Sequence, residues 1–155
     1  MKKLLTGSII GAVLAGGIVL PSVSADEPYN HPKREVLRAA RSGDAALKAV
    51  LARGVSIDAT DDDGETALME AADERRADTL RVLVANGADV NRADEDGETA
   101  LMIAADEGNL EAVRILLDAG ANINARDEDG ETALDKAIDE RHRDVADALR
   151  AAGAR

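Results

Sequence analysis

The sequence predicts an all-α solenoid of about four helix-turn-helix units joined by β-turn loops. The first observation is a period of 33 residues, in which the run Asp63–Leu68 recurs at Asp96–Leu101 and at Asp129–Leu134. The second is that apolar residues within each unit recur three and four positions apart, as on one face of a helix. The third is that the chain has no Phe or Trp and a single Tyr, a composition that suits small side chains on closely packed helices.

Residues 1–25 are predicted to be a signal peptide. Lys2 and Lys3 give a positive start, residues 4–20 are apolar, and Val23-Ser24-Ala25 offers small residues for cleavage before Asp26. The apolar stretch has 17 residues and contains four glycines, so its length favours a cleaved leader over a membrane anchor. We therefore expect a periplasmic protein, with secretion as the alternative, and no stable membrane association after cleavage.

A short tail over residues 26–32 is expected to precede the first repeat unit, residues 33–60. No Asp-Gly-x-Thr loop precedes Glu35, and Gly43 and Gly54 are 11 residues apart, against 12 between Gly108 and Gly120. This unit is therefore predicted to be a shortened amino-terminal cap of the solenoid.

Two internal units follow, residues 61–93 and 94–126, which are identical at 17 of 33 aligned positions. In the first of them Thr66 is placed to cap a helix that begins at Ala67, and a second helix is expected over residues 77–85. The turn between the two helices carries Arg75 here and Gly108 in the next unit. A left-handed backbone conformation kept at an arginine would cost on the order of 1 kcal/mol.

The last unit, residues 127–155, is predicted to be the carboxy-terminal cap. It ends just after its second helix, on which it places the charged residues Arg143, Asp144, Asp147 and Arg150. A polar outer surface is what a terminal repeat requires. Four units, two internal and two capping, are enough to stack a continuous core.

The repeat resembles the ankyrin repeat over residues 33–155, and the unit at residues 94–126 is close to the family consensus. The family's Thr-Pro-Leu-His tetrapeptide stands here as Thr66-Ala67-Leu68-Met69 and, in the last unit, as Thr132-Ala133-Leu134-Asp135. The resemblance implies a helical scaffold for protein–protein interaction. It also implies a binding surface made of the loop tips and the exposed ends of the inner helices.

Composition excludes several classes of function. A formal net charge of −12 opposes binding to nucleic acids and to anionic membranes. The absence of cysteine excludes disulfides, thiolate zinc sites and a cysteine nucleophile. His31 and His142 are the only imidazoles, and neither has a nucleophile at a meaningful spacing. We therefore expect no enzyme activity, cofactor or metal site, and we expect His142 to be exposed in a turn.

The candidate partner-binding residues are the acidic side chains at the positions that the ankyrin resemblance implies for partner binding. At the loop tips they are Asp62, Asp63, Glu65, Glu95, Asp96, Glu98, Glu128, Asp129 and Glu131, and at the ends of the inner helices they are Asp73, Glu74, Asp106, Glu107, Asp139 and Glu140. Stacked units would align these carboxylates in rows whose repulsion costs stability. The rows therefore predict a basic protein partner for a chain that is otherwise monomeric.

The sequence is also compatible with alternatives to a basic partner. Beyond residue 25 the chain has three Lys against 14 Arg, so a salt-rich habitat or a coding bias could also account for the acidity, although the outer helices mix charge signs. A divalent-cation-binding structural protein is a second alternative, but the EF-hand-like run at Asp61–Gly64 has Ala59 at its first ligand position. An immunity or auxiliary factor for an exported toxin or enzyme is a third.

Overall fold

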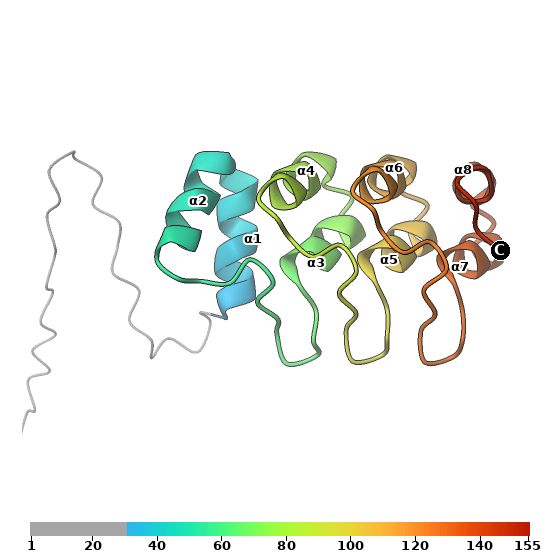
Figure 1. Ribbon diagram of the computed structural model, residues 1–155, viewed down its shortest axis with the longest axis horizontal. Coiled ribbons are helices and arrows are strands. Elements are labelled where there is room, and N and C mark those ends of the chain that lie inside the picture. The colour runs from blue at the N-terminus through green and yellow to red at the C-terminus, as the bar shows by residue number, and fades with distance from the viewer. Residues whose placement is uncertain (1–30) are drawn as a thin grey trace, which may run out of the picture. The chain divides into compact units, whose positions relative to one another are not determined.

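Helices occur in pairs in the computed structural model, which describes residues 31–155 (Figure 1). The predicted leader and nearly all of the predicted tail lie outside the described residues. The helices are α1 (Pro32–Ser42), α2 (Asp44–Ala52), α3 (Ala67–Asp73), α4 (Ala77–Ala85), α5 (Ala100–Asp106), α6 (Leu110–Asp118), α7 (Ala133–Asp139) and α8 (Arg143–Ala151).

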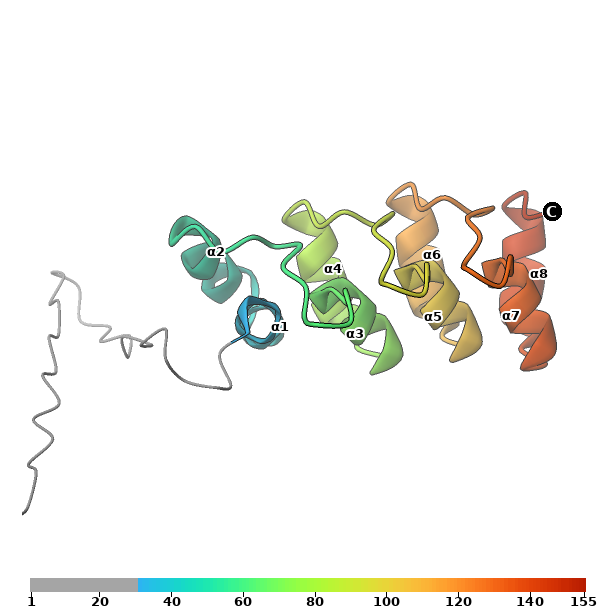
Figure 2. The same ribbon diagram turned by 90° about the horizontal axis from the view of Figure 1, so that it is seen from below.

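The helix pairs stack side by side within residues 31–155. Helices α1, α3, α5 and α7 form an inner row, and α4, α6 and α8 form the outer row that α2 begins (Figures 1 and 2). Long loops connect each pair to the next and project from one side of the stack (Figure 1). Within the described residues the only β structure is two isolated bridges at the bases of loops, Thr60 with Thr66 and Ala93 with Thr99. The predicted all-α solenoid is confirmed.

Each inner helix of the last three pairs begins at a threonine cap, as the sequence predicts. The Met69 N–H donates to the Thr66 hydroxyl at 3.3 Å, and the Thr66 N–H points at the Met69 sulfur at 3.4 Å. The Thr99 cap of α5 has the same arrangement. In α7 a carboxylate oxygen of Asp135 takes the place of the sulfur. These contacts satisfy backbone donors that the first turn of a helix leaves without partners.

The loops are held in register by hydrogen bonds within and between units. Asp61 accepts the Glu65 N–H at 2.9 Å, a local bond that closes the turn. The Glu95 N–H then donates to the Asp63 carbonyl of the preceding loop at 3.1 Å. Equivalent bonds recur one unit later. Side chains at the loop tips are therefore presented at fixed positions along the stack.

The core combines leucine with alanine, as the composition predicts. Alanines on the inner helices, such as Ala71 and Ala104, are fully buried and let neighbouring helices approach closely. The large side chains that are least exposed are Leu47, Leu68, Met69, Leu80, Leu83, Leu101, Met102, Leu116 and Leu149, with three valines. Charged residues of the last outer helix, α8, remain exposed at Arg143, Asp144, Asp147 and Arg150.

The turn between paired helices keeps a left-handed residue in the last three units. Its φ angle is 57° at Arg75, 64° at Gly108 and 63° at Arg141, so both arginines keep a left-handed conformation that strains a residue with a side chain. A Cβ atom at Gly108 would lie 2.5 Å from Nδ1 of His142. His142 is accordingly half-buried, and the expectation that it is exposed was wrong because its ring occupies the space above this glycine.

Candidate protein-binding surface

The fifteen predicted acidic residues lie along the loops and at the ends of the inner helices. Eleven of them are exposed, whereas Glu65, Glu98, Glu107 and Glu131 are half-buried. We call this set the acidic surface. Several of its members contact cations of the same chain, and those contacts were not predicted from the sequence.

Lys33 lies at the amino-terminal end of the acidic surface. This residue of α1 is only 3% exposed. Its ammonium group lies 2.7 Å from Asp61, 2.8 Å from Glu65 and 3.1 Å from Glu70. Burial alone would lower the pKa of Lys33, but the hydrogen bonds to these three carboxylates outweigh it and raise that pKa.

Lys136 of α7 makes a similar set of contacts near the carboxy-terminal end. Its ammonium group lies 2.5 Å from Glu98 of the preceding unit, 3.1 Å from Asp127 and 3.8 Å from Glu131. Burial favours a lower pKa for Lys136, and the hydrogen bonds to Glu98 and Asp127 raise it instead. Both lysines are therefore firmly charged and held among carboxylates.

Arginines pair with acidic residues at the ends of the inner helices. Arg41 contacts Glu74, and Arg75 contacts both the carbonyl and the carboxylate of Glu107. Five of the fifteen predicted residues thus have a cationic partner within residues 31–155: Glu65, Glu74, Glu98, Glu107 and Glu131. Lys33, Lys136, Arg41 and Arg75 therefore interrupt the expected rows of like charge.

Alignment of the repeats contains a signal for Lys136. The position changes from Glu70 to Ile103 to Lys136 across three successive units. Lys33 has no comparable signal, because it lies in the shortened first unit, whose register against the others is set by the fold. Glu70 was likewise not predicted as part of the surface.

An acidic groove lies between α3 and α5, in the central part of the surface. Its volume is about 170 Å³, and Ile103 and Met69 provide its apolar part. The carboxylates that line it are Glu65, Glu70, Asp73, Glu98, Asp106 and Glu107. The groove combines an apolar floor with several negative charges, which suits the aliphatic stem and charged head of a basic side chain.

Comparison with protein families identifies the repeat. The family described as "Ankyrin repeats (3 copies)" matches residues 36–127 and, in a second match, residues 92–155. The chain belongs to the ankyrin-repeat family. A search of curated proteins found no match.

Ankyrin repeats are generally protein–protein interaction modules and are typically non-catalytic. In this ankyrin-repeat chain, residues 31–155 contain no group of three His, Asp or Glu placed to hold a metal ion. His31 and His142 lie in different units, and His142 packs on Gly108. None of the helices in the described region is long and apolar enough to cross a membrane.

Proposed function

We propose that this protein is an exported, non-catalytic interaction module that binds a basic protein through the acidic surface. The observation that carries the proposal is the pair of lysine sites. The acidic surface already holds the ammonium groups of Lys33 and Lys136, each among three carboxylates. A surface that twice holds lysine of its own chain has the chemistry to hold lysine of another.

The unit at residues 94–126, which we call the central unit, has the corresponding carboxylates but no lysine of its own. Lys136 contacts two carboxylates of its own loop and one from the preceding loop. Moved back by one period of 33 residues, these three become Asp94, Glu98 and Glu65, and Lys136 becomes Ile103. A basic side chain of a partner that lies over Ile103 would therefore meet the corresponding three carboxylates, and it would share Glu98 with Lys136 and Glu65 with Lys33.

The negative charge favours a cationic partner mainly by raising the rate of association and the specificity of binding, because each single ion pair is weak. An exposed ion pair contributes about 0.2–1 kcal/mol, so stable binding needs several contacts along the surface. A net charge of −12 accelerates the encounter with a cationic partner and makes binding weaken as salt screens the charges.

Substitution Ile103→Lys tests the proposal by supplying the missing lysine from within the chain. The probe is a fluorescein-labelled peptide of repeating Lys-Ala-Ala units, and its binding is measured by fluorescence anisotropy at several salt concentrations. We expect the wild-type protein to bind it at low salt, and Ile103→Lys to weaken binding about tenfold, because the new ammonium occupies the central carboxylates.

A matched control separates this local effect from the change in net charge. Ala85 is exposed on the outer helix α4, and Ala85→Lys adds the same charge away from the acidic surface. We expect it to leave the affinity for the peptide within about twofold of the wild type. Equal losses in the two variants would contradict a specific site at the central unit.

Export rests on the leader pattern of residues 1–25 and is tested separately. Mass spectrometry of the protein recovered from its native cell should give a first residue of Asp26. A mature protein that still begins at Met1 would contradict export, and it would leave the peptide-binding experiment unaffected.

A further inference from the structure

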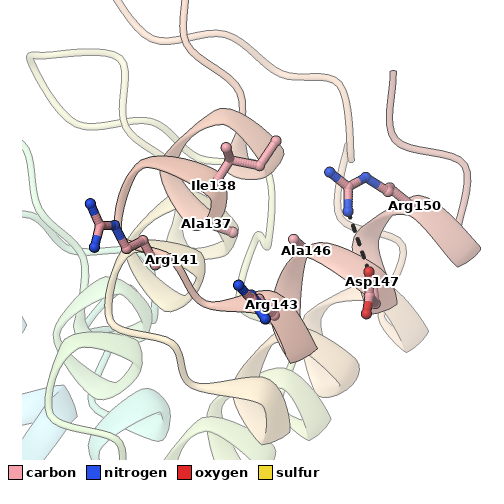
Figure 3. Close-up of a pocket in the computed structure, with 7 residues that line it drawn as sticks. All are labelled: Ala137, Ile138, Arg141, Arg143, Ala146, Asp147 and Arg150. Carbon is pink, nitrogen blue, oxygen red and sulfur yellow. Dashed lines mark hydrogen bonds and ion pairs between the residues drawn. The ribbon is translucent and has the colours of Figure 1, made fainter.

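The carboxy-terminal end of the stack carries a cavity of a different character from the acidic surface. It has a volume of about 520 Å³ and lies between α7 and α8. Its lining includes Ile138, Arg141, Arg143 and Arg150 (Figure 3). In the internal units the equivalent face packs against the next repeat, as when Asn109 donates to the Ala72 carbonyl. Here no further repeat follows within the described residues.

The apolar part of this end is not explained by its position as a cap. A terminal repeat is expected to turn polar residues outward, and Arg143 does this where the preceding unit has Leu110. Ile138, in contrast, is a larger apolar residue than its equivalents in the preceding units. Its equivalents Ala72 and Ala105 are small and fully buried, whereas Ile138 is 46% exposed and is the only large hydrophobic side chain exposed within residues 31–155.

The cationic part of this end contrasts with the charge of the chain. Arg141 and Arg143 form no ion pair within residues 31–155, whereas Arg150 pairs with Asp147 at 3.3 Å. Arg141 also keeps a left-handed backbone with φ of 63°, which glycine would adopt without strain. Two guanidinium groups without an ion pair in the described part of the chain thus line the same cavity as an exposed isoleucine, in a protein whose net charge is −12.

We propose that this end of the stack is a second binding surface, which binds an acidic segment of a protein partner. An apolar side chain of that segment packs on Ile138, and its carboxylates pair with Arg141 and Arg143. Guanidinium groups suit this role because their fixed fork of donors matches the two oxygens of a carboxylate. This surface adjoins the acidic surface at Asp139 and Glu140, which follow Ile138 in the sequence, and it requires a ligand of the opposite charge.

Fluorescence anisotropy with a labelled peptide, Glu-Leu-Glu-Glu-Leu-Glu, tests the proposal on the purified full-length protein. We expect binding at low salt that weakens as salt rises. The double variant Arg141→Gly, Arg143→Gln should weaken it about tenfold, and Ile138→Ala should weaken it severalfold. Both variants should fold, because the preceding unit has glycine and alanine at positions 108 and 105, and circular dichroism checks this.

The matched control is Arg75→Gly, which removes a guanidinium group from the equivalent turn two units earlier. We expect it to bind the peptide as the wild type does. A second control replaces each Glu of the peptide by Gln, and this peptide should not bind. Failure of the wild type to bind, an unchanged affinity in the double variant, or an equal loss in Arg75→Gly would each overturn the proposal.

Discussion

The central repeat, residues 94–126, can be compared with the two repeats beside it, which share its backbone but differ in charge and strain. The central repeat has Gly108 in its turn, whereas its neighbours hold Arg75 and Arg141 in the same left-handed conformation. Lys33 contacts the loop of the repeat before the central one, and Lys136 contacts its own loop and Glu98 of the central loop. In the central repeat Ile103 stands at the position of Lys136. The repeat backbone therefore tolerates these exchanges, and individual residues give each unit its own charge.

The largest effect is expected from removing Lys33 and Lys136, the lysines that contact the loops before and after the central repeat. Lys33→Met should lower the free energy of unfolding by about 3 kcal/mol, because it leaves three carboxylates facing one another around a buried site. Lys136→Met should cost about 2 kcal/mol, since its side chain is more exposed. Urea unfolding followed by circular dichroism measures both. The control Lys48→Met removes an exposed lysine from α2 and should cost less than about 0.5 kcal/mol.

Lowering the pH should reduce the difference in the free energy of unfolding between the wild type and Lys33→Met. Burial raises the pKa of Asp61, but its hydrogen bonds to Lys33 and to the loop backbone lower it below the ordinary value of 3.8. A carboxylate with a lowered pKa stabilises the fold above its unfolded-state pKa, and that contribution disappears as the pH falls through the folded-state pKa. If the two proteins still differ by the same free energy of unfolding below pH 3, this account of Lys33 is contradicted.

Much of the fold could be predicted from the sequence because short-range patterns determine it. The threonine caps and the helix over residues 77–85 follow from spacing within one unit. The packing of His142 on Gly108 could not be predicted in this way, because it brings together residues of two units. Stacking geometry fixes such contacts, and a repeat period alone does not specify which neighbouring side chains meet.

A smaller effect tests why the central turn keeps its glycine. Gly108→Ala should cost about 2 kcal/mol, since it combines backbone strain with a collision between Cβ and the His142 ring. His142 corresponds to Asn109 one unit earlier. The smaller Asn109 side chain faces the unit before it, at Ala72, and the turn of that unit already holds Arg75. In the background of His142→Asn, the cost of Gly108→Ala should therefore fall to about 1 kcal/mol.

A double-mutant cycle from thermal or urea unfolding measures this coupling. The smallest effect is expected from the opposite kind of substitution in the next turn. Arg141→Gly relieves backbone strain and should stabilise the protein by up to about 1 kcal/mol. If the costs of Gly108→Ala are equal in both backgrounds, the difference between the central and neighbouring turns does not come from His142.

The candidate site was only partly accessible to sequence reasoning. Aligning the repeats predicts that the fifteen carboxylates lie on one side of the stack, since they recur at the same positions of each unit. Pairing with Lys33 required the fold, because α1 belongs to a shortened unit and reaches Asp61 across 28 residues. The cationic end was also not predicted, because the charged residues of α8 were interpreted only as a polar cap.

The threonine caps give the first two inner helices of the full repeats a built-in chemical probe. Met69 and Met102 are 1% exposed, and their sulfur atoms face the N–H groups of Thr66 and Thr99. Peroxide converts an accessible thioether to a polar sulfoxide, so these sulfurs react only when their own repeat opens. The rates of sulfoxide formation at the two positions therefore report the local opening of two neighbouring repeats separately, without any label.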